Sequence, residues 1–182
     1  MIYRFIFSGT GGQGVITAAI VLSEAALYYE GLNAVQTQVY GPEARGGSAR
    51  SDVILADSEI WFPKVLEPNV AVCLSQQAYD KFSGVVRPGG IIVVDPHYVQ
   101  IHRNISSRQF QIPIHDTVRE ATGQALGLNM CMLGAVIRLI PIVSPDSMRQ
   151  AIVERFDERF ANTNLTAFDR GLALVTESVR TF

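Results

Sequence analysis

Residues 2–15 have the sequence IYRFIFSGTGGQGV. The apolar run Ile2–Phe7 is typical of a strand, and apolar residues with helical spacing follow from Val15 to Glu30. The glycines between them therefore lie in a strand-to-helix turn, which is where α/β proteins build anion-binding sites. This stretch predicts an α/β fold with a candidate binding site at the end of its first strand.

The rest of the chain continues the alternation and then becomes helical. The continuous β-branched runs are typical of strands that are buried on both faces of a parallel sheet. We expect strands at Asn33–Val39, Val70–Leu74, Ile91–Asp95 and Phe110–Ile114, and a hairpin pairing Asp52–Ala56 with Glu59–Phe62. We expect helices at Gln76–Phe82, His115–Leu126, Leu128–Ile140, Pro145–Phe160 and Leu165–Val179. The sequence predicts one three-layer Rossmann-like domain, residues 1–182, with a mainly parallel sheet and a helical C-terminal third.

Composition limits the partners of this chain. Its 182 residues are 48% hydrophobic and 18% charged, which indicates apolar surface that another chain covers. A net charge of -2 argues against nucleic acid as the main partner. The longest apolar stretch, Leu128–Val143, is short and is interrupted by Asn129, Arg138 and Pro141, so we expect no membrane span. The strand at the N-terminus leaves no room for a signal peptide, and we expect a cytoplasmic protein.

Cysteine and histidine are few and far apart in the sequence. Cys73 and Cys131 stand alone, and an iron–sulfur cluster or a structural zinc ion needs several clustered ligands. His97, His102 and His115 are likewise scattered. We therefore expect no metal site.

The first glycine segment has two interpretations. Gly9, Gly11 and Gly14 satisfy G-x-G-x-x-G, and glycines without Cβ atoms let backbone N–H groups approach a phosphate. A nicotinamide cofactor also needs an acid at the end of the second strand, and none occurs there before Glu43. No Lys-Ser/Thr pair follows the glycines, which excludes a P-loop. The alternative is that the glycines only permit a tight turn and close helix packing.

The second glycine-rich segment is Tyr40–Ser51, with the sequence YGPEARGGSARS. Its arginines offer planar forks suited to carboxylate or phosphate, and its glycines let a partner approach the backbone. The alternative is a solvated loop in which the arginines pair with Glu43 and Asp52. With the first segment, it supplies the candidate ligand-binding residues Gly9, Gly11, Gly12, Gln13, Gly14, Tyr40, Arg45, Gly46, Gly47 and Arg50.

Together the two segments resemble the gamma subunit of 2-oxoacid:ferredoxin (acceptor) oxidoreductases. The resemblance rests on Gly11–Gly14 and Gln36–Gly47, and it continues through Ser51–Ile54, Ile60–Lys64 and the turn Arg87–Gly90. The form Pro-Glu-Ala-Arg-Gly-Gly is most similar to the 2-oxoglutarate type. Indolepyruvate relatives usually show Gln-Arg-Gly-Gly, and pyruvate-type gamma chains often carry a doubled arginine.

The resemblance implies oxidative decarboxylation of a 2-oxo acid with coenzyme A to acyl-CoA, carbon dioxide and two low-potential electrons. Thiamine diphosphate with Mg²⁺, and iron–sulfur clusters, would be held by alpha, beta and ferredoxin-like subunits. This chain has neither a Gly-Asp-Gly thiamine motif nor the cysteines for a cluster. We therefore expect it to be inactive alone, to carry no catalytic acid or base, and to complete the active-site cleft on the coenzyme A side.

Two surfaces are candidate subunit interfaces. Trp61-Phe62-Pro63 places two large aromatic residues before a proline. The helix Leu128–Ile140 is apolar nearly all round, so it is either a core helix or an interface helix. A homodimer of the isolated chain could use the same surfaces. Two other functions remain open: a stand-alone nucleotide- or CoA-binding protein, and an NAD(P)-dependent enzyme.

Overall fold

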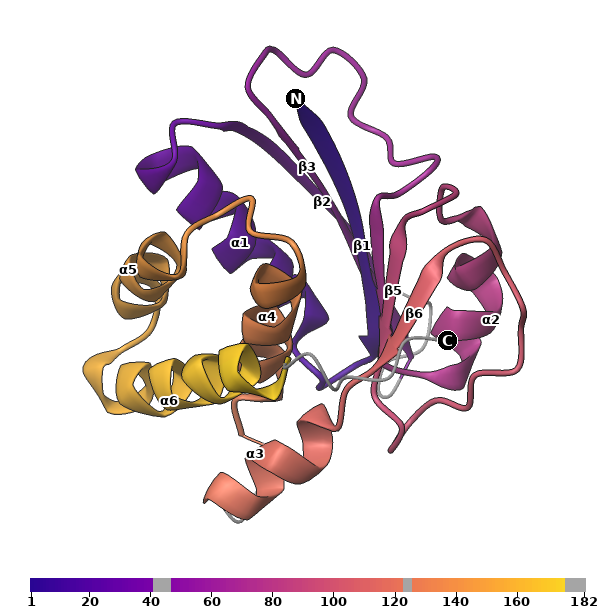
Figure 1. Ribbon diagram of the computed structural model, residues 1–182. Coiled ribbons are helices and arrows are strands. Elements are labelled where there is room, and N and C mark those ends of the chain that lie inside the picture. Colours follow the sequence, from indigo (N-terminus) through magenta and orange to yellow (C-terminus); the bar gives the residue numbers. More distant parts are fainter. Residues whose placement is uncertain (41–46, 123–125, 176–182) are drawn as a thin grey trace.

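A computed structural model describes residues 1–40, 47–122 and 126–175 of the protein (Figure 1). The described residues form a six-stranded sheet of order β2-β3-β1-β4-β5-β6. β1, β4, β5 and β6 are parallel, and β3 is antiparallel to both of its neighbours, β1 and β2. The predicted mainly parallel sheet is confirmed. Its strands are β1 (Ile2–Thr10), β2 (Asn33–Tyr40), β3 (Ser48–Ala56), β4 (Val70–Cys73), β5 (Ile91–Val94) and β6 (Arg108–Gln111).

Helices cover both faces of this sheet, as expected for three layers. One face carries α1 (Val15–Tyr29), α4 (Leu128–Leu139), α5 (Pro145–Arg155) and α6 (Glu158–Leu174). The other face carries α2 (Gln76–Phe82) and the 3₁₀ turn η1 (Ser83–Val85), while α3 (Ile114–Thr122) lies beyond the end of the strands. No helix in the described ranges is both long and apolar enough to cross a membrane.

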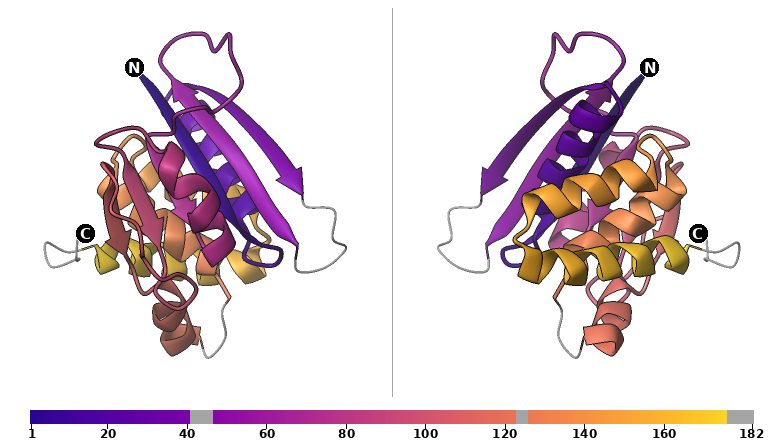
Figure 2. Two further views of the ribbon diagram at one scale, coloured as in Figure 1. Left: turned by 90° about the vertical axis from the view of Figure 1, so that its right-hand side faces the viewer. Right: turned by 90° about the vertical axis from the view of Figure 1, so that its left-hand side faces the viewer.

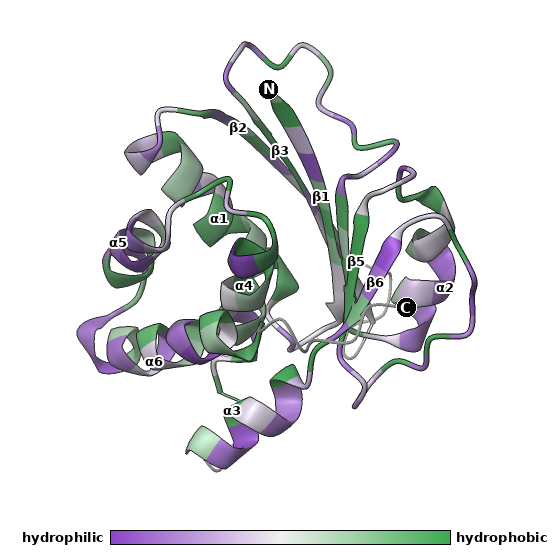
Figure 3. Ribbon diagram, viewed as in Figure 1, coloured by the Kyte–Doolittle hydropathy of each residue, from purple (hydrophilic) through white to green (hydrophobic). Residues whose placement is uncertain are grey.

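Alternation along β1 divides the core into two parts. Phe5 and Phe7 belong to the cluster under α1 and α4, whereas Ile6 between them belongs to the cluster under α2. β4 and β5 are buried along their whole length, which explains their continuous β-branched sequences. Figure 3 shows hydrophobic residues on these strands and on α1 and α4.

The predicted hairpin is wrong. Residues 59–62 form no strand, and β3 pairs with β1 on one side and with β2 on the other. Because both edges of β3 are occupied, the segment after Ala56 has no free edge of β3 to pair with. Pro63 also lacks the N–H group that a ladder needs. The strand predicted at Phe110–Ile114 lies earlier, at Arg108–Gln111, because Ile114 already begins α3.

The C-terminal helices differ from the prediction at one break. The helix expected at Pro145–Phe160 ends at Arg155, and Phe156 is extended. Asp157 then stands in the N-cap position of α6, which runs through Phe160 and Leu165 to Leu174. The side chain of Asp157 makes no capping hydrogen bond, and its carbonyl oxygen accepts the N–H groups of Phe160 and Ala161. An aspartate at this position is nevertheless a start signal that the helical spacing alone does not show. The last residues of the predicted helix Leu165–Val179 lie outside the described residues, and α3 ends at Thr122 rather than at Leu126.

α4 is a core helix. Met130, Cys131 and Met132 are all fully buried. α4 crosses α6 at two glycines, and because these residues have no side chains the two backbones approach closely. A Cβ atom at Gly134 would overlap the carbonyl oxygen of Phe168, and one at Gly171 would overlap that of Cys131. The interface interpretation of this helix is therefore wrong for the described residues.

Candidate functional site

The two glycine-rich segments meet at the carboxyl edge of the parallel strands. β1 and β2 end at this edge, and β3 begins there. Gly11 donates its N–H to the carbonyl oxygen of Gly47 at 2.8 Å, and Ser8 lies opposite Arg50 in the ladder. For the described residues of both segments, the sequence prediction that they lie at one rim of the sheet is confirmed.

Gln13 occupies the crevice between the ends of β1 and β4. The chain leaves β1 through α1 toward β2 and leaves β4 through α2 toward β5, so this crevice is a topological switch point, where ligands bind in open α/β sheets. Gln13 Oε1 accepts the N–H of Thr10 at 2.7 Å, and Nε2 donates to the carbonyl of Leu74 at 2.8 Å. A Cβ atom at Gly9 would overlap the Gln13 amide. The absence of a side chain at Gly9 therefore leaves room for Gln13, whose hydrogen bonds hold the turn in place.

Within the described part of the chain, the start of α1 has no side-chain cap, and the amide of Asn129 packs against it by donating to the carbonyl oxygen of Gly14 at 3.4 Å. Gly12 and Gly14 have φ values of 94° and 72°, a conformation that favours glycine. Among the described residues none caps α1 with its side chain, and its first turn carries no acid. The N–H groups at this end are therefore directed toward the carboxyl edge without a side-chain acceptor. The turn role of these glycines is visible, and their contact with a ligand stays a prediction.

Arg50 lies on a strand. Its Nε and Nη2 donate to Asp52 Oδ1 and Oδ2 at 2.6 and 2.7 Å, and its guanidinium lies 4.7 Å from the centre of the Phe82 ring. A solvated loop is wrong for Arg50, because the ladder to β1 and β2 begins at Ser48 despite the glycines before it. The pairing with Asp52 matches the alternative interpretation, so a ligand at Arg50 would have to share this guanidinium.

The remaining candidate residues are only partly described. Tyr40 is the last residue of β2 and pairs with Ala49, and Gly47 is half-buried beside Gly11. Arg45, Gly46 and the proposed acidic partner Glu43 lie outside the described residues.

Asp95 organises a part of this edge that the sequence analysis missed. It follows β5 and is fully buried. Its Oδ1 accepts the backbone N–H of His97 at 2.9 Å, and its Oδ2 accepts that of His115 at 2.6 Å. Burial raises the pKa of Asp95, although these two hydrogen bonds act in the opposite direction. One carboxyl group thus joins the loop after β5 to the start of α3.

The histidines at positions 97 and 115 are consequently neighbours. Their rings stack with centroids 3.6 Å apart and planes at 11°, and Tyr98 packs edge-on against both. Burial raises the pKa of Tyr98. The description of these histidines as scattered is wrong. Each follows the end of a parallel strand, and that position could have placed them at one edge.

The comparisons with known proteins agree with this fold. Residues 4–174 match the family model described as pyruvate ferredoxin/flavodoxin oxidoreductase. A relative from Methanocaldococcus jannaschii, 2-oxoglutarate synthase subunit KorC, is 42% identical over 172 residues, which are 93% of this chain and 92% of the relative.

Two solved structures share the fold. The gamma subunit of keto/oxoacid ferredoxin oxidoreductase from Geobacter sulfurreducens has a TM-score of 0.89 at 32% identity, with 99% of both chains covered. The 2-oxoglutarate:ferredoxin oxidoreductase from Magnetococcus marinus, solved with coenzyme A bound, has a TM-score of 0.85 at 22% identity and shares the fold. The match covers 97% of this chain but 32% of that one. By its family match and its relatives, this chain belongs to the pyruvate ferredoxin/flavodoxin oxidoreductase family.

Proposed function

We propose that this chain is the gamma subunit of a coenzyme A-dependent 2-oxoacid:ferredoxin (acceptor) oxidoreductase that acts on 2-oxoglutarate. The observation that carries the proposal is the 42% identity, over nearly the whole of both chains, to a 2-oxoglutarate synthase subunit. The complex, which we expect in the cytoplasm, would oxidatively decarboxylate the 2-oxo acid. This chain would contribute one wall of the cleft.

Iron–sulfur chemistry belongs to other subunits in this proposal. Cys73 and Cys131 lie in different clusters of the core, on opposite faces of the sheet. Burial raises the pKa of each thiol to about 12, so the thiolate that a cluster needs is strongly disfavoured. These residues do not fit a cluster. The sequence also lacks a thiamine motif, so we assign thiamine diphosphate and Mg²⁺ to the alpha and beta subunits.

We place coenzyme A at the carboxyl edge. Its phosphates would meet the uncapped start of α1 at Gly12 and Gly14, where the helix dipole favours negative charge. The N–H groups of Gly11 and Gln13 are already donated to the carbonyl oxygens of Gly47 and Thr10. Tyr40, Arg45, Gly46, Gly47 and Arg50 would form the opposite wall, joined to the glycine turn through the Gly11–Gly47 hydrogen bond. An alternative for the two arginines is an acidic group on a neighbouring subunit.

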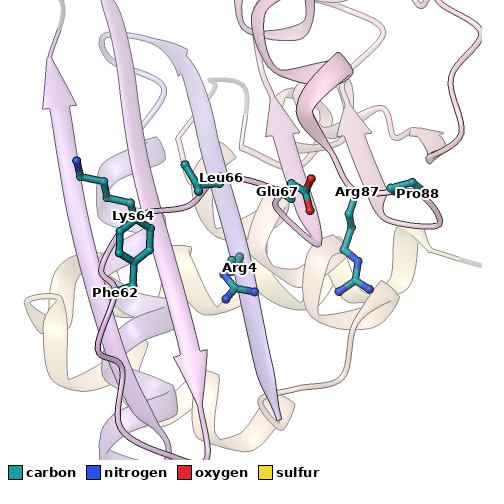
Figure 4. A pocket seen from close by; sticks show the side chains of 7 residues that line it. All are labelled: Arg4, Phe62, Lys64, Leu66, Glu67, Arg87 and Pro88. Atoms are coloured by element: carbon teal, nitrogen blue, oxygen red, sulfur yellow. The ribbon is translucent and has the colours of Figure 1, made fainter.

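The sheet face beside α2 is the surface that we propose a larger subunit covers. No described helix lies over β2 and β3 on this side (Figure 2). Trp61 and Phe62 in the segment that follows β3 are 86% and 57% exposed. A pocket of about 660 Å³ opens beside this segment (Figure 4). In its lining the positively charged side chains outnumber the single acidic one. The pocket is lined by Arg4, Phe62, Lys64, Leu66, Glu67, Arg87 and Pro88. We expect the partner to present apolar and acidic side chains here.

The subunit role predicts that the tagged chain, purified from its native cells, carries larger chains with it. The eluate should reduce a viologen dye only when coenzyme A and a 2-oxo acid are both present, and 2-oxoglutarate should be the preferred acid over pyruvate and 2-oxoisovalerate. Preference for another acid would change the substrate but keep the role. A chain that is recovered alone and inactive contradicts the proposal, and tight binding of coenzyme A by it would favour a stand-alone CoA-binding protein.

Arg45→Ala should raise the KM for coenzyme A by about ten-fold, because a charge-assisted contact contributes about 1.4 kcal/mol or more. If Arg45 instead contacts a neighbouring subunit, the variant should lose subunits on gel filtration. Arg155→Ala is the control, since Arg155 pairs with Glu24 on the helical layer at 2.7 Å. An Arg45→Ala complex with unchanged KM for coenzyme A and unchanged assembly would refute both versions.

A further inference from the structure

Three potential metal ligands converge where the loop after β5 meets the start of α3. Nδ1 of His115 lies 3.1 Å from Oδ1 of Asp116, and Nδ1 of His97 lies 3.9 Å from the same oxygen. One ligand atom from each of the three residues lies within 4.8 Å of the other two. Two imidazole nitrogens and one carboxylate oxygen form a ligand set of the kind that binds zinc and neighbouring divalent transition metals.

The fold fixes the backbone of both histidines before any ion arrives. Asp95 accepts backbone N–H groups from both His97 and His115, which sets the separation of the two chain segments. The side chain of His115 is only 12% exposed, and Asp116 follows it in the first turn of α3.

His97 is the adjustable ligand. An imidazole nitrogen binds a metal along a line in the plane of its ring, so two parallel stacked rings cannot both bind one ion without moving. The side chain of His97 is 43% exposed and lies in the turn that follows β5, which leaves space for its ring to swing away from His115. Binding of one ion by both rings therefore requires this stack, in which the two ring faces cover each other, to open.

We propose that His97, His115 and Asp116 form a binding site for one divalent transition metal ion of the zinc class, with at least one coordination position open to water. The site belongs to this chain alone and does not rest on the subunit role proposed above. A bound ion would tie the loop after β5 to α3 at the edge that carries the glycine turn. Solvent reaches the site directly, since Asp116 is 63% exposed.

The test uses the whole chain, purified with a tag that contains no histidine and freed of metal with a chelator. Titration with Co²⁺ should give saturable visible absorption with one ion per chain, and Zn²⁺ should displace it. Binding should weaken in acid, because protons compete with the metal ion for imidazole nitrogens. Zn²⁺ should also raise the Tm of the chain, since it binds only the folded state.

Removing one ligand identifies the site. His97→Ala should weaken Co²⁺ binding by about 100-fold or more, because loss of even an indirect partner of a metal ligand weakens binding 10- to 100-fold. His115→Ala should do the same. His102→Ala is the matched control, since His102 lies 3.4 Å from Asp80 without a second histidine in its pair, and it should bind as the wild type does.

His97 is exposed, so the His97→Ala chain should keep its circular dichroism spectrum and wild-type Tm. Absence of binding at millimolar Co²⁺, or equal affinity in wild type and His97→Ala, overturns the proposal.

Discussion

Gly171→Ala should destabilise the protein by about 3 kcal/mol, at the upper end of the usual cost of overpacking a core. The new Cβ atom would overlap the carbonyl oxygen of Cys131 and lie 2.7 Å from its carbonyl carbon. These are backbone atoms of a helix whose residues are buried against the sheet, so α4 cannot move away without opening the core. The Tm should fall by roughly 10 °C for a chain of this size.

Gly84→Ala is the control for this prediction. Its nearest atom would be the end of the Arg103 side chain at 3.6 Å, which is an ordinary contact. The same chemical change should therefore alter stability by less than about 0.5 kcal/mol. Thermal unfolding of both variants decides the matter, and a Gly171→Ala chain that melts with the wild type would show that the two helices are not packed through their backbones.

Asp95→Ala should cost about 3 kcal/mol of stability at neutral pH. It removes the acceptor of two N–H groups, those of His97 and His115, and each unsatisfied donor costs about 1–3 kcal/mol where water does not replace the carboxylate. Relief from burying a carboxyl group, whose pKa burial raises, offsets part of this cost. Asp80→Ala, an exposed position on α2, should change stability by less than about 0.5 kcal/mol.

The pH dependence of Asp95 has a definite sign. Because its pKa is raised in the folded state, Asp95 binds more protons in the folded chain than in the unfolded chain above about pH 4. The contribution of Asp95 to the free energy of unfolding therefore falls as the pH rises from its unfolded pKa through its folded pKa. Asp95→Asn cannot titrate, so the stability gap between wild type and Asp95→Asn should narrow from about pH 4 to pH 7. Urea unfolding at both pH values measures the gap. A gap that widens would mean that the folded state prefers the ionised carboxylate.

Local signals account for the parts of the fold that the sequence predicted well. The apolar spacing of α1 and the run of β5 depend on neighbours in the chain, and both elements lie within one residue of their predicted bounds. The start of β3 could not be found in this way. Gly46-Gly47-Ser48 reads locally as loop, yet the ladders to β1 and β2 begin at Ser48. Pairing with distant strands decides that boundary.

The same distinction between local signals and contacts with distant residues applies to the candidate site. The glycine turn and its meeting with the second segment followed from motif and topology. The role of Gln13 did not, because the Leu74 carbonyl that it bonds is 61 residues away in sequence. The stacked histidines depend on one buried aspartate that bonds a residue of the loop after β5 and a residue in the first turn of α3. Such a carboxyl group leaves no periodic signal, although its position at the end of a buried strand marks it as a residue to examine.

The central position of β1 has a consequence for the synthesis of the protein. β1 is the first strand made, but its partners are β3 and β4, so its second ladder closes only when the chain has reached Cys73. Until then a growing chain carries an unpaired edge on the strand that will lie in the middle of the sheet, and this strand contains the apolar residues Phe5 and Phe7. Open edges of this kind recruit other chains. The interval between the emergence of β1 and of β4 is therefore the time at which this protein most needs a chaperone.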